Sequence, residues 1–346
     1  MTAISTVKTS NGPKSTLWCG AYTSVSGGAA TGIGRIDLLC ESLQLAVAAE
    51  IESPSFIALH PSLPVLYAVS ESAGFVHAFM IAPSGQLEVL GRGWPTGKDP
   101  CHVAVDPRGM SLVTSSWGDG SVDVYGLDAH GAIVGRSRVP VAVDHGAGLP
   151  RQSRAHCALF IEDYWAVTTD LGLDLLRVWR LSANGWILDH EVVFPPGSGP
   201  RHVARHPSGR LLVVAEFTSE IFSLARVNGS FAIQNSMLST SRERNTDMAA
   251  AHVAINDEGT RAYVSIRQSN SVSTFAIEPE DGELTLLAET PCGGEWPRHH
   301  ALHLGSLLVA NERSGSVAVL LLDAEGIPLP AQAWLPAPSP TCLVVG

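Results

Sequence analysis

Histidine recurs at the same place in a series of similar segments along the chain. The clearest of these segments are Pro100-Cys101-His102, Pro200-Arg201-His202 and Pro297-Arg298-His299. The residues aligned at the third position of seven segments are Phe56, His102, His156, His202, His252, His299 and Cys342. Arg154 lies two residues before His156. Arginine binds carboxylate or phosphate groups and histidine transfers protons, so the pattern indicates chemistry on a small polar anion.

A second set of reactive side chains follows the next apolar run of each segment. Its aligned members are Tyr22, Glu71, Trp117, Asp170, Glu216, Arg267 and Glu312. If the two sets meet, they form one mixed ring, in which His or Glu moves protons and Arg stabilises negative charge. The arginines among the histidines would repel a cation, so we expect no metal.

Some of these histidines have a competing interpretation. A repeated histidine can bond the backbone of a neighbouring repeat and do nothing else, and for His102 and His252 both interpretations stay open. His60 and His206 each precede a proline at the turn on the opposite face. We interpret these two as structural.

The segments are the starts of a longer repeat, at residues 54, 100, 154, 200, 250 and 297. Each start is followed by a turn, a second apolar run, a turn rich in Gly, Ser or Asp, and two more short alternating runs. Four strands in a repeat of about 45 residues are typical of a β-propeller blade. Residues 17–48 provide the second, third and fourth strands of a further blade, and the segment that starts at Pro340 provides its first strand.

The sequence therefore predicts an all-β fold, a seven-bladed β-propeller with four-stranded blades. The C-terminal strand joins the N-terminal blade and closes the ring, which removes an open sheet edge. We expect residues 16–346 to form this single domain and residues 1–15 to be a disordered or extended segment. Because the first two strands of a blade are antiparallel, both sets of reactive residues should meet at one mouth of the central channel.

Composition argues against several kinds of partner. The net charge of −11 provides no general basic face for nucleic acid or an anionic membrane. The sequence has no run of about 18 apolar residues and no secretory signal pattern, so we expect a cytoplasmic protein. Its six cysteines lack zinc-like spacing, which favours buried thiols. We expect a monomer or a weak homodimer.

Taken blade by blade, several short motifs resemble one protein family. They are Gly20-Ala21-Tyr22-Thr23, the segment from Arg151 to His156, Gly199-Pro200-Arg201-His202, Ala215-Glu216 and the segment from Gly293 to Arg298. In this order they resemble the seven-bladed propeller lactonases, which comprise propeller-type 6-phosphogluconolactonases and carboxymuconate lactonising enzymes. The resemblance implies a site built from His156, Arg201, Glu216 and Arg267. The chain departs from the family pattern at Ile266, Gln268 and Trp117, where Asn, Gly and Tyr are usual.

We therefore expect a metal-independent lactonase without a cofactor, acting on an anionic sugar lactone, foremost 6-phosphogluconolactone. The predicted catalytic residues are His156, Glu216, Arg201 and Arg267. The predicted substrate-binding residues are Arg154, His202, Arg298, His102, Asp170 and Trp117. One alternative is a cycloisomerase that acts on a muconate-type dicarboxylate with the same arginines. A second alternative is a non-catalytic propeller that binds a protein partner.

Overall fold

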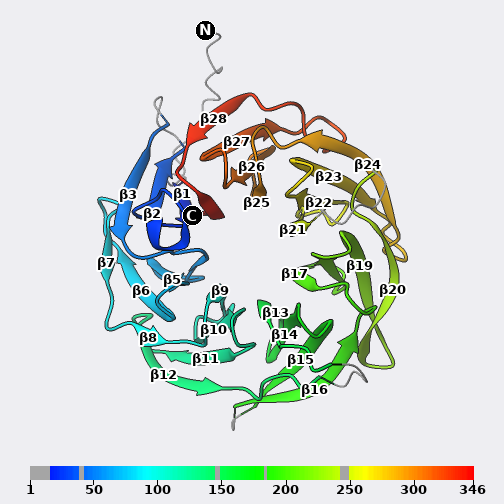
Figure 1. Cartoon of the computed structure of the whole chain (residues 1–346), viewed down its shortest axis with the longest axis horizontal. Helices are drawn as coiled ribbons and strands as arrows, with labels where there is room; N and C mark the ends of the chain where they lie inside the picture. The colour runs from blue at the N-terminus through cyan, green and yellow to red at the C-terminus, as the bar shows by residue number, and fades with distance from the viewer. Residues whose placement is uncertain (1–15, 39–42, 145–148, 183–184, 242–248) are drawn as a thin grey trace.

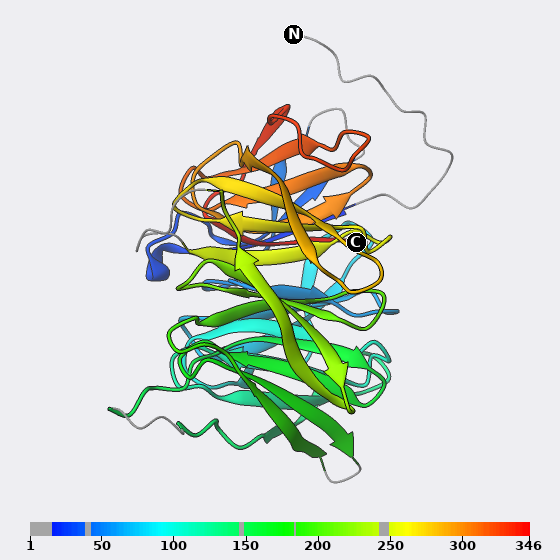
Figure 2. The ribbon, with the colours of Figure 1, turned by 90° about the vertical axis from the view of Figure 1, so that its right-hand side faces the viewer.

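The computed structural model describes residues 16–38, 43–144, 149–182, 185–241 and 249–346. Residues 1–15, which we expect to be disordered or extended, lie outside the described residues. Seven small antiparallel sheets surround a central channel (Figure 1). Seen from the side, the strands of neighbouring blades lie stacked on one another (Figure 2). The predicted seven-bladed propeller is confirmed.

Each blade is numbered here by its place along the chain. Blade 1 contains β29 (Pro340–Val345), β1 (Thr16–Ala21), β2 (Gly32–Asp37) and β3 (Leu45–Glu50). Blade 2 contains β4 (Ile57–Leu59), β5 (Val65–Ser70), β6 (Phe75–Ile81), β7 (Leu87–Val89) and β8 (Trp94–Pro95). Blade 3 contains β9 (Pro100–Val105), β10 (Ser111–Ser116), β11 (Val122–Leu127) and β12 (Ile133–Arg138). Blade 4 contains β13 (Ala155–Glu162), β14 (Trp165–Asp170), β15 (Leu175–Ser182) and β16 (Gly185–Val193).

The second half of the ring repeats the same plan. Blade 5 contains β17 (Pro200–Arg205), β18 (Leu211–Ala215), β19 (Glu220–Val227) and β20 (Ser230–Leu238). Blade 6 contains β21 (Ala250–Ile255), β22 (Arg261–Ile266), β23 (Ser271–Ile277) and β24 (Leu284–Pro291). Blade 7 contains β25 (Pro297–His303), β26 (Ser306–Asn311), β27 (Ser316–Leu321) and β28 (Ala333–Pro336). The described residues include one short 3₁₀ turn, η1 (Ser24–Ser26). Among these residues no helix is long and apolar enough to cross a membrane.

Blade 2 differs slightly from the predicted four-stranded blade. Its outer strand is split into β7 and β8, and both pieces pair with β6. Gly91, between the two pieces, has a φ of +76°, a backbone conformation that glycine adopts without steric cost. The chain therefore leaves the sheet edge at this point and returns to it at Trp94.

The C-terminal strand closes the ring as predicted. β29 pairs antiparallel with β1, in a register that sets Leu17 opposite Val345 and Gly20 opposite Cys342. The backbones of Thr16 and Gly346 exchange two hydrogen bonds of 2.9 Å. The inner strand of blade 1 thus comes from the opposite end of the chain.

The hydrophobic core lies between the blades. Seven buried clusters occur in the described chain, and each combines residues of two neighbouring blades. In β18, Leu211 and Val213 pack toward blade 4, whereas Leu212 and Val214 pack toward blade 6. Successive strand residues point to opposite faces, and both faces are covered here, which explains the uninterrupted apolar runs of the middle strands.

His60 and His206 connect neighbouring blades at the face opposite the predicted site. The Nε2 of His206 lies 2.7 Å from the Gly259 carbonyl of blade 6, and the Nε2 of His60 lies 3.2 Å from the Gly109 carbonyl of blade 3. In each ring Nδ1 accepts a backbone N–H, so Nε2 must carry the proton that it donates. The predicted structural role of both histidines is confirmed.

The link between blades 5 and 6 gives a stability prediction. His206→Ala leaves the buried Gly259 carbonyl without its donor, which should cost about 1–3 kcal/mol of unfolding free energy. Urea unfolding followed by tryptophan fluorescence measures this change. The exposed His130→Ala is the matched control and should leave the urea midpoint unchanged. An unchanged midpoint for His206→Ala would show that this bond contributes nothing.

Candidate active site

A β-bulge on the inner strands determines which side chains reach the channel. In blade 5, Pro200 lies opposite Ala215 and His202 lies opposite Val214, so Arg201 is the extra residue. The same shift occurs in β9, β13, β21, β25 and on the β1–β29 pair. A bulge sets two residues opposite one and re-aims a side chain. Arg201 and His202 accordingly line the same cavity although they are neighbours in sequence.

The register of blade 4 corrects the sequence alignment by one residue. Ala155 lies opposite Asp170 and Cys157 opposite Thr169, so His156 is the bulged residue. His156 is therefore equivalent to Arg201 and Arg298, while Cys157 is the equivalent of His202. The shift went unnoticed because an alternating pattern carries no mark of an inserted residue.

The same shift removes Asp170 from the ring at the channel mouth. A backbone hydrogen bond repeats in all seven blades, and its donors include Glu216, Glu312 and Leu171. Leu171 thus takes the place that the alignment gave to Asp170. Asp170 is only 2% exposed, and its carboxylate accepts hydrogen bonds from the Ser153 hydroxyl and from the backbone N–H groups of Arg154, Gly172 and Leu173. It holds the loop that carries Arg154 and does not face the channel mouth.

Two rings of side chains therefore line the channel. The bulge ring consists of Cys101, His156, Arg201, Ala251, Arg298, Thr341 and, by the equivalent backbone bonds of blade 2, Ser55. The histidine ring below it consists of Phe56, His102, Cys157, His202, His252, His299 and Cys342. Members of both rings and Glu71 enclose a cavity of about 20 Å³. This is room for about one water molecule.

The first group at the cavity is the glutamate–arginine cluster, formed by Arg201, Glu216 and Arg267. Arg201 Nε lies 2.8 Å from Glu216 Oε2, and Arg267 Nη2 lies 2.9 Å from Oε1. Arg201 Nη1 donates to the Ala251 carbonyl, and the Arg267 guanidinium lies 5.5 Å from the ring centre of Trp296. Each guanidinium is therefore fixed in place by neighbours from other strands.

Burial and charge oppose one another in this cluster. Burial disfavours the charge of Glu216, but Arg267 and Arg201 together outweigh it and hold the pKa of the carboxyl below its ordinary value. Burial, with the nearby charge of Arg267, lowers the pKa of Arg201 to about 10. Glu216 and Arg201 are thus ionised at neutral pH.

The second group is the tyrosine network, formed by Tyr22, Glu71, Arg298 and Glu312. Arg298 Nη2 donates to the Tyr22 hydroxyl at 2.6 Å, and Arg298 Nη1 lies 3.1 Å from Glu312 Oε2. The Tyr22 hydroxyl donates to the Glu71 carboxyl, at 3.2 Å from Oε1 and 3.3 Å from Oε2. Of these four residues, only Arg298 is predicted from the sequence to have a role in the site. The other three stood in the aligned set, and their common place at strand ends was the available signal.

Arg154 is placed differently from the other arginines. Its guanidinium lies 3.8 Å from the ring centre of Trp117, a side chain that is 40% exposed. Its Nη2 donates to Gln152 Oε1 at 3.3 Å. Within the described residues no carboxylate forms an ion pair with Arg154, which leaves its charge available to an anion from solvent.

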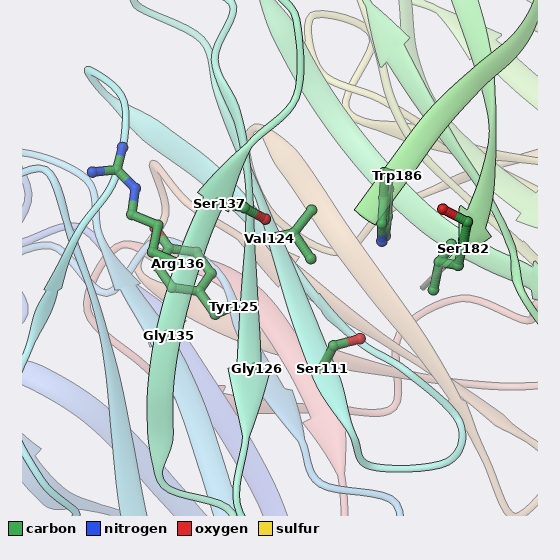
Figure 3. A pocket seen from close by; sticks show the side chains of 10 residues that line it. Ser111, Val124, Tyr125, Gly126, Gly135, Arg136, Ser137, Ser182 and Trp186 are labelled. Atoms are coloured by element: carbon green, nitrogen blue, oxygen red, sulfur yellow. The ribbon is translucent and has the colours of Figure 1, made fainter. Parts of the chain in front are cut away.

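A more spacious groove lies at the side of the propeller. It measures about 260 Å³ and runs between blades 3 and 4, where Gly126 and Gly135 face each other across two strands (Figure 3). Arg136 brings a charge to it, but that charge lies 2.9 Å from the Asp123 carboxylate. The groove offers no base and no free cation among its described residues.

The comparison with protein families agrees with this geometry. Residues 16–345 match the family model described as "Lactonase, 7-bladed beta-propeller". The chain belongs to this family. The 6-phosphogluconolactonase of Bacillus subtilis is 27% identical over 323 residues, which cover 89% of this chain and 91% of that protein. The 6-phosphogluconolactonase of Formosa agariphila is 27% identical over 330 residues, which cover 89% of this chain and 93% of that protein.

Two solved structures share the fold of this lactonase-family protein. A protein of Lactobacillus plantarum has a TM-score of 0.87 at 23% identity, covering 96% of this chain and 99% of its own. The periplasmic gluconolactonase of Pseudomonas aeruginosa has a TM-score of 0.83 at 22% identity, covering 96% and 98%. These similarities support the propeller fold, and the family matches confirm the resemblance seen in the sequence.

The histidine ring forms an uncharged floor beneath the two arginine groups of this lactonase-family chain. His102 Nδ1 accepts the N–H of Ala158 at 3.4 Å, and His299 Nδ1 accepts the N–H of Leu343 at 3.3 Å. The rings of His252 and His299 lie 3.7 Å apart, and those of His202 and His252 lie 4.2 Å apart. Burial lowers the pKa of each of these histidines. His102 thus has the inter-blade bond that the structural interpretation requires.

The floor also contains a possible set of metal ligands. In the described part of the chain, His102, Cys157 and His202 bring ligand atoms within 4.8 Å of one another. The bond from Ala158 to His102 Nδ1 requires the proton on Nε2, the nitrogen that faces Cys157 Sγ at 3.4 Å. Burial also raises the pKa of the Cys157 thiol to about 12. These protons and the charge of Arg201 disfavour a cation here.

The buried histidines give a prediction for stability against pH. Their pKa values lie below the ordinary 6.5 in the folded protein, so unfolding takes up protons and stability falls as pH drops below about 6.5. Each fully shifted histidine contributes about 1.4 kcal/mol per pH unit until its folded pKa is reached. Glu71 has the opposite effect on stability. Its pKa is raised in the folded protein, so unfolding releases at most one proton from it.

Urea unfolding between pH 5 and 7.5 measures this slope, above the range in which ordinary carboxyl groups titrate. We expect unfolding to take up several protons at the low end of this pH range. In His252→Gln this number should be smaller by about one. The exposed His130→Gln is the control and should not change the slope. A flat profile would show that the floor histidines are protonated in the folded state.

Proposed function

We propose that this protein hydrolyses an anionic sugar lactone, with 6-phosphogluconolactone as its foremost substrate. The observation that carries the proposal is one ionised glutamate held between two buried arginines, beside a neutral histidine at the mouth of the channel. The family and the two relatives named 6-phosphogluconolactonase support it.

His156 is the proposed base for the attacking water. It lines the cavity, and its buried Nδ1 has no hydrogen-bond partner among the described residues. Burial, and then the charges of Arg201 and Arg298, hold the pKa of His156 well below its ordinary value. A bound anionic substrate offsets those positive charges, which raises the proton affinity of the imidazole when it is needed.

Arg201 and Arg298 are the proposed stabilisers of the oxyanion that forms when water adds to the carbonyl carbon. Both line the cavity and both are fixed by glutamates, Arg201 by Glu216 and Arg298 by Glu312. Charged donors that are already in place need no reorganisation during the reaction, which is the main source of such stabilisation. Glu216, with both oxygens paired to arginines, is proposed to position Arg201 and Arg267.

Arg154 is the proposed phosphate anchor. A guanidinium binds phosphate through two parallel hydrogen bonds, and stacking on Trp117 fixes the plane of the fork. His202 and His102 lie in the wall of the small cavity beside Arg201 and are proposed to bound the substrate site from below, without binding its charge. Asp170 is proposed only to hold the Arg154 loop.

The first activity prediction tests the oxyanion site and the base. Arg201→Ala and His156→Ala should each lower kcat/KM for 6-phosphogluconolactone about 10²–10³-fold without added metal, because each removes a group that acts on the transition state. A pH-stat assay corrected for spontaneous hydrolysis measures the rates. Arg205→Ala, an exposed arginine on the same strand, is the control. Full activity in both variants would remove this site from consideration.

The second activity prediction tests the anchor. Arg154→Ala should raise KM for 6-phosphogluconolactone about 10–100-fold, the loss of roughly 1.5–3 kcal/mol from a charged hydrogen-bond pair. KM for unphosphorylated gluconolactone should stay within about twofold. The exposed Arg180→Ala provides the control. Equal losses for the two substrates would mean that Arg154 does not bind the phosphate.

The cycloisomerase alternative uses the same arginines to hold two carboxylates. Measuring muconate cyclisation beside lactone hydrolysis with the same preparation separates the two reactions. The cytoplasmic location and the monomeric or weakly dimeric state stay predictions, and one structural relative is named as periplasmic.

A further inference from the structure

Glu71 is a second carboxyl group at the cavity that the proposed mechanism leaves unused. It follows β5 in blade 2, and its backbone N–H donates to the Ser53 carbonyl in the bond that repeats in every blade. Its side chain lines the same small cavity as His156, Arg201 and Arg298. Blades 2 and 5 lie on different sides of the channel (Figure 1), so Glu71 and Glu216 are carried by different walls.

The two glutamates have opposite surroundings. Each oxygen of Glu216 faces the guanidinium of a separate arginine. Both oxygens of Glu71 face the Tyr22 hydroxyl, and the one arginine nearby, Arg298, is already paired with Glu312. Asp99 adds negative charge near Glu71, and the remaining neighbours, Ser55 and the Cys101 thiol, are uncharged. The local charge balance therefore favours ionisation of Glu216 more strongly than ionisation of Glu71.

The pKa shifts of the two carboxyl groups agree with this charge balance. Burial raises the pKa of Glu71, and the charge of Arg298 only partly offsets it. The pKa of Glu216 lies below its ordinary value. Two carboxyl groups whose environments separate their proton affinities are the usual source of an acid and a base in one site.

Lactone opening requires such an acid. When the tetrahedral intermediate collapses, the bond between the carbonyl carbon and the ring oxygen breaks, and its electron pair goes to the ring oxygen. An aliphatic alkoxide is a strong base and a poor leaving group, so a proton must be supplied to that oxygen. The arginines hold their protons too firmly for this transfer.

We propose that Glu71 is the general acid that protonates the leaving ring oxygen, and that Tyr22 positions it. The inference rests on the proposed lactonase function. The O–H bond of Glu71 breaks as the O–H bond of the product alcohol forms, and Glu71 is left as a carboxylate. The proton that His156 takes from water is released to solvent, and Glu71 is reprotonated from solvent, so the catalyst returns to its starting state. The Tyr22 hydroxyl, held by Arg298, lies 3.2 Å and 3.3 Å from the two oxygens of Glu71 and so orients the carboxyl group at the wall of the cavity.

The test varies the leaving group. Glu71→Gln keeps the shape of the side chain and loses the acidic proton. With 6-phosphogluconolactone, its kcat should fall about 10²-fold or more, with little change in KM. With dihydrocoumarin, whose leaving oxygen is a phenol that ionises near pH 10, the same variant should lose less than about fivefold, because a phenolate departs without a proton. Arg201→Lys should slow both substrates.

Three further variants separate catalysis from structure. Glu71→Asp keeps a carboxylic acid and should retain part of the kcat that Glu71→Gln loses. Glu71→Gln should abolish the alkaline limb of the plot of kcat against pH, whereas Tyr22→Phe should only shift it. Glu312→Gln removes a carboxylate from the same network without removing the acid. Because it also releases Arg298 to face Glu71, it should slow 6-phosphogluconolactone more than dihydrocoumarin, in the same sense as Glu71→Gln but to a smaller extent. Thermal unfolding of each variant identifies any that fails to fold.

The outcomes are distinct. Equal slowing of both substrates by Glu71→Gln, or unchanged kcat with 6-phosphogluconolactone, would overturn the role of Glu71 while the lactonase function stands. A wild-type protein that hydrolyses neither lactone would overturn the proposed function, and this inference with it.

Discussion

The bulge on the inner strand of the blades is the constraint on which the site depends. Without it, alternation would send every second residue of the inner strand into the packing between blades, and one residue per blade would reach the channel. With it, two successive residues do so, as in Arg201 and His202. The upper member can then be a charged group near the mouth while the lower member forms the floor. A repeated backbone bond from the second strand, such as Glu216 N–H to the Gly199 carbonyl, fixes the height at which the opposing acids enter.

The local arrangement of charges in this protein matters more for its site than the net charge. The chain carries a net −11, yet Arg154, Arg201, Arg267 and Arg298 lie at the same end of four successive blades. Three of them are bound to glutamates, which keeps the buried cations tolerable. Arg154 is unpaired among the described residues and is the most accessible to an incoming anion. A partly compensated cluster binds an anion without requiring a large positive field across the whole protein.

Sequence reasoning predicted the fold because the signals for it are local and repeated. The alternation of apolar and polar residues and the turn residues between the runs predict the blades. The two incomplete repeats at the ends of the chain predict the seventh blade and its closure through Pro340–Val345. It failed where one inserted residue mattered. In blade 4 the motif ending at His156 aligns with the histidines of the other blades. The bulge that moves His156 into the bulge ring, beside Arg201 and Arg298, cannot be recognised from the sequence. The contacts among Tyr22, Glu71 and Arg298 join blades 1, 2 and 7, so they depend on how the ring closes and not on any local pattern.

In the proposed mechanism, the neutral floor lets the arginines above it act on a substrate. If His202, His252 and His299 were protonated, three more charges would lie within ring-contact distance of one another, and their repulsion would oppose closure of the ring. They would also attract an anion deeper into the channel, away from His156 and Arg201. Because burial keeps these histidines neutral, the attraction is confined to the level of the bulge ring. The same burial strengthens each charged contact there, since a cavity with room for about one water screens them weakly. The floor thus contributes to specificity through its lack of charge.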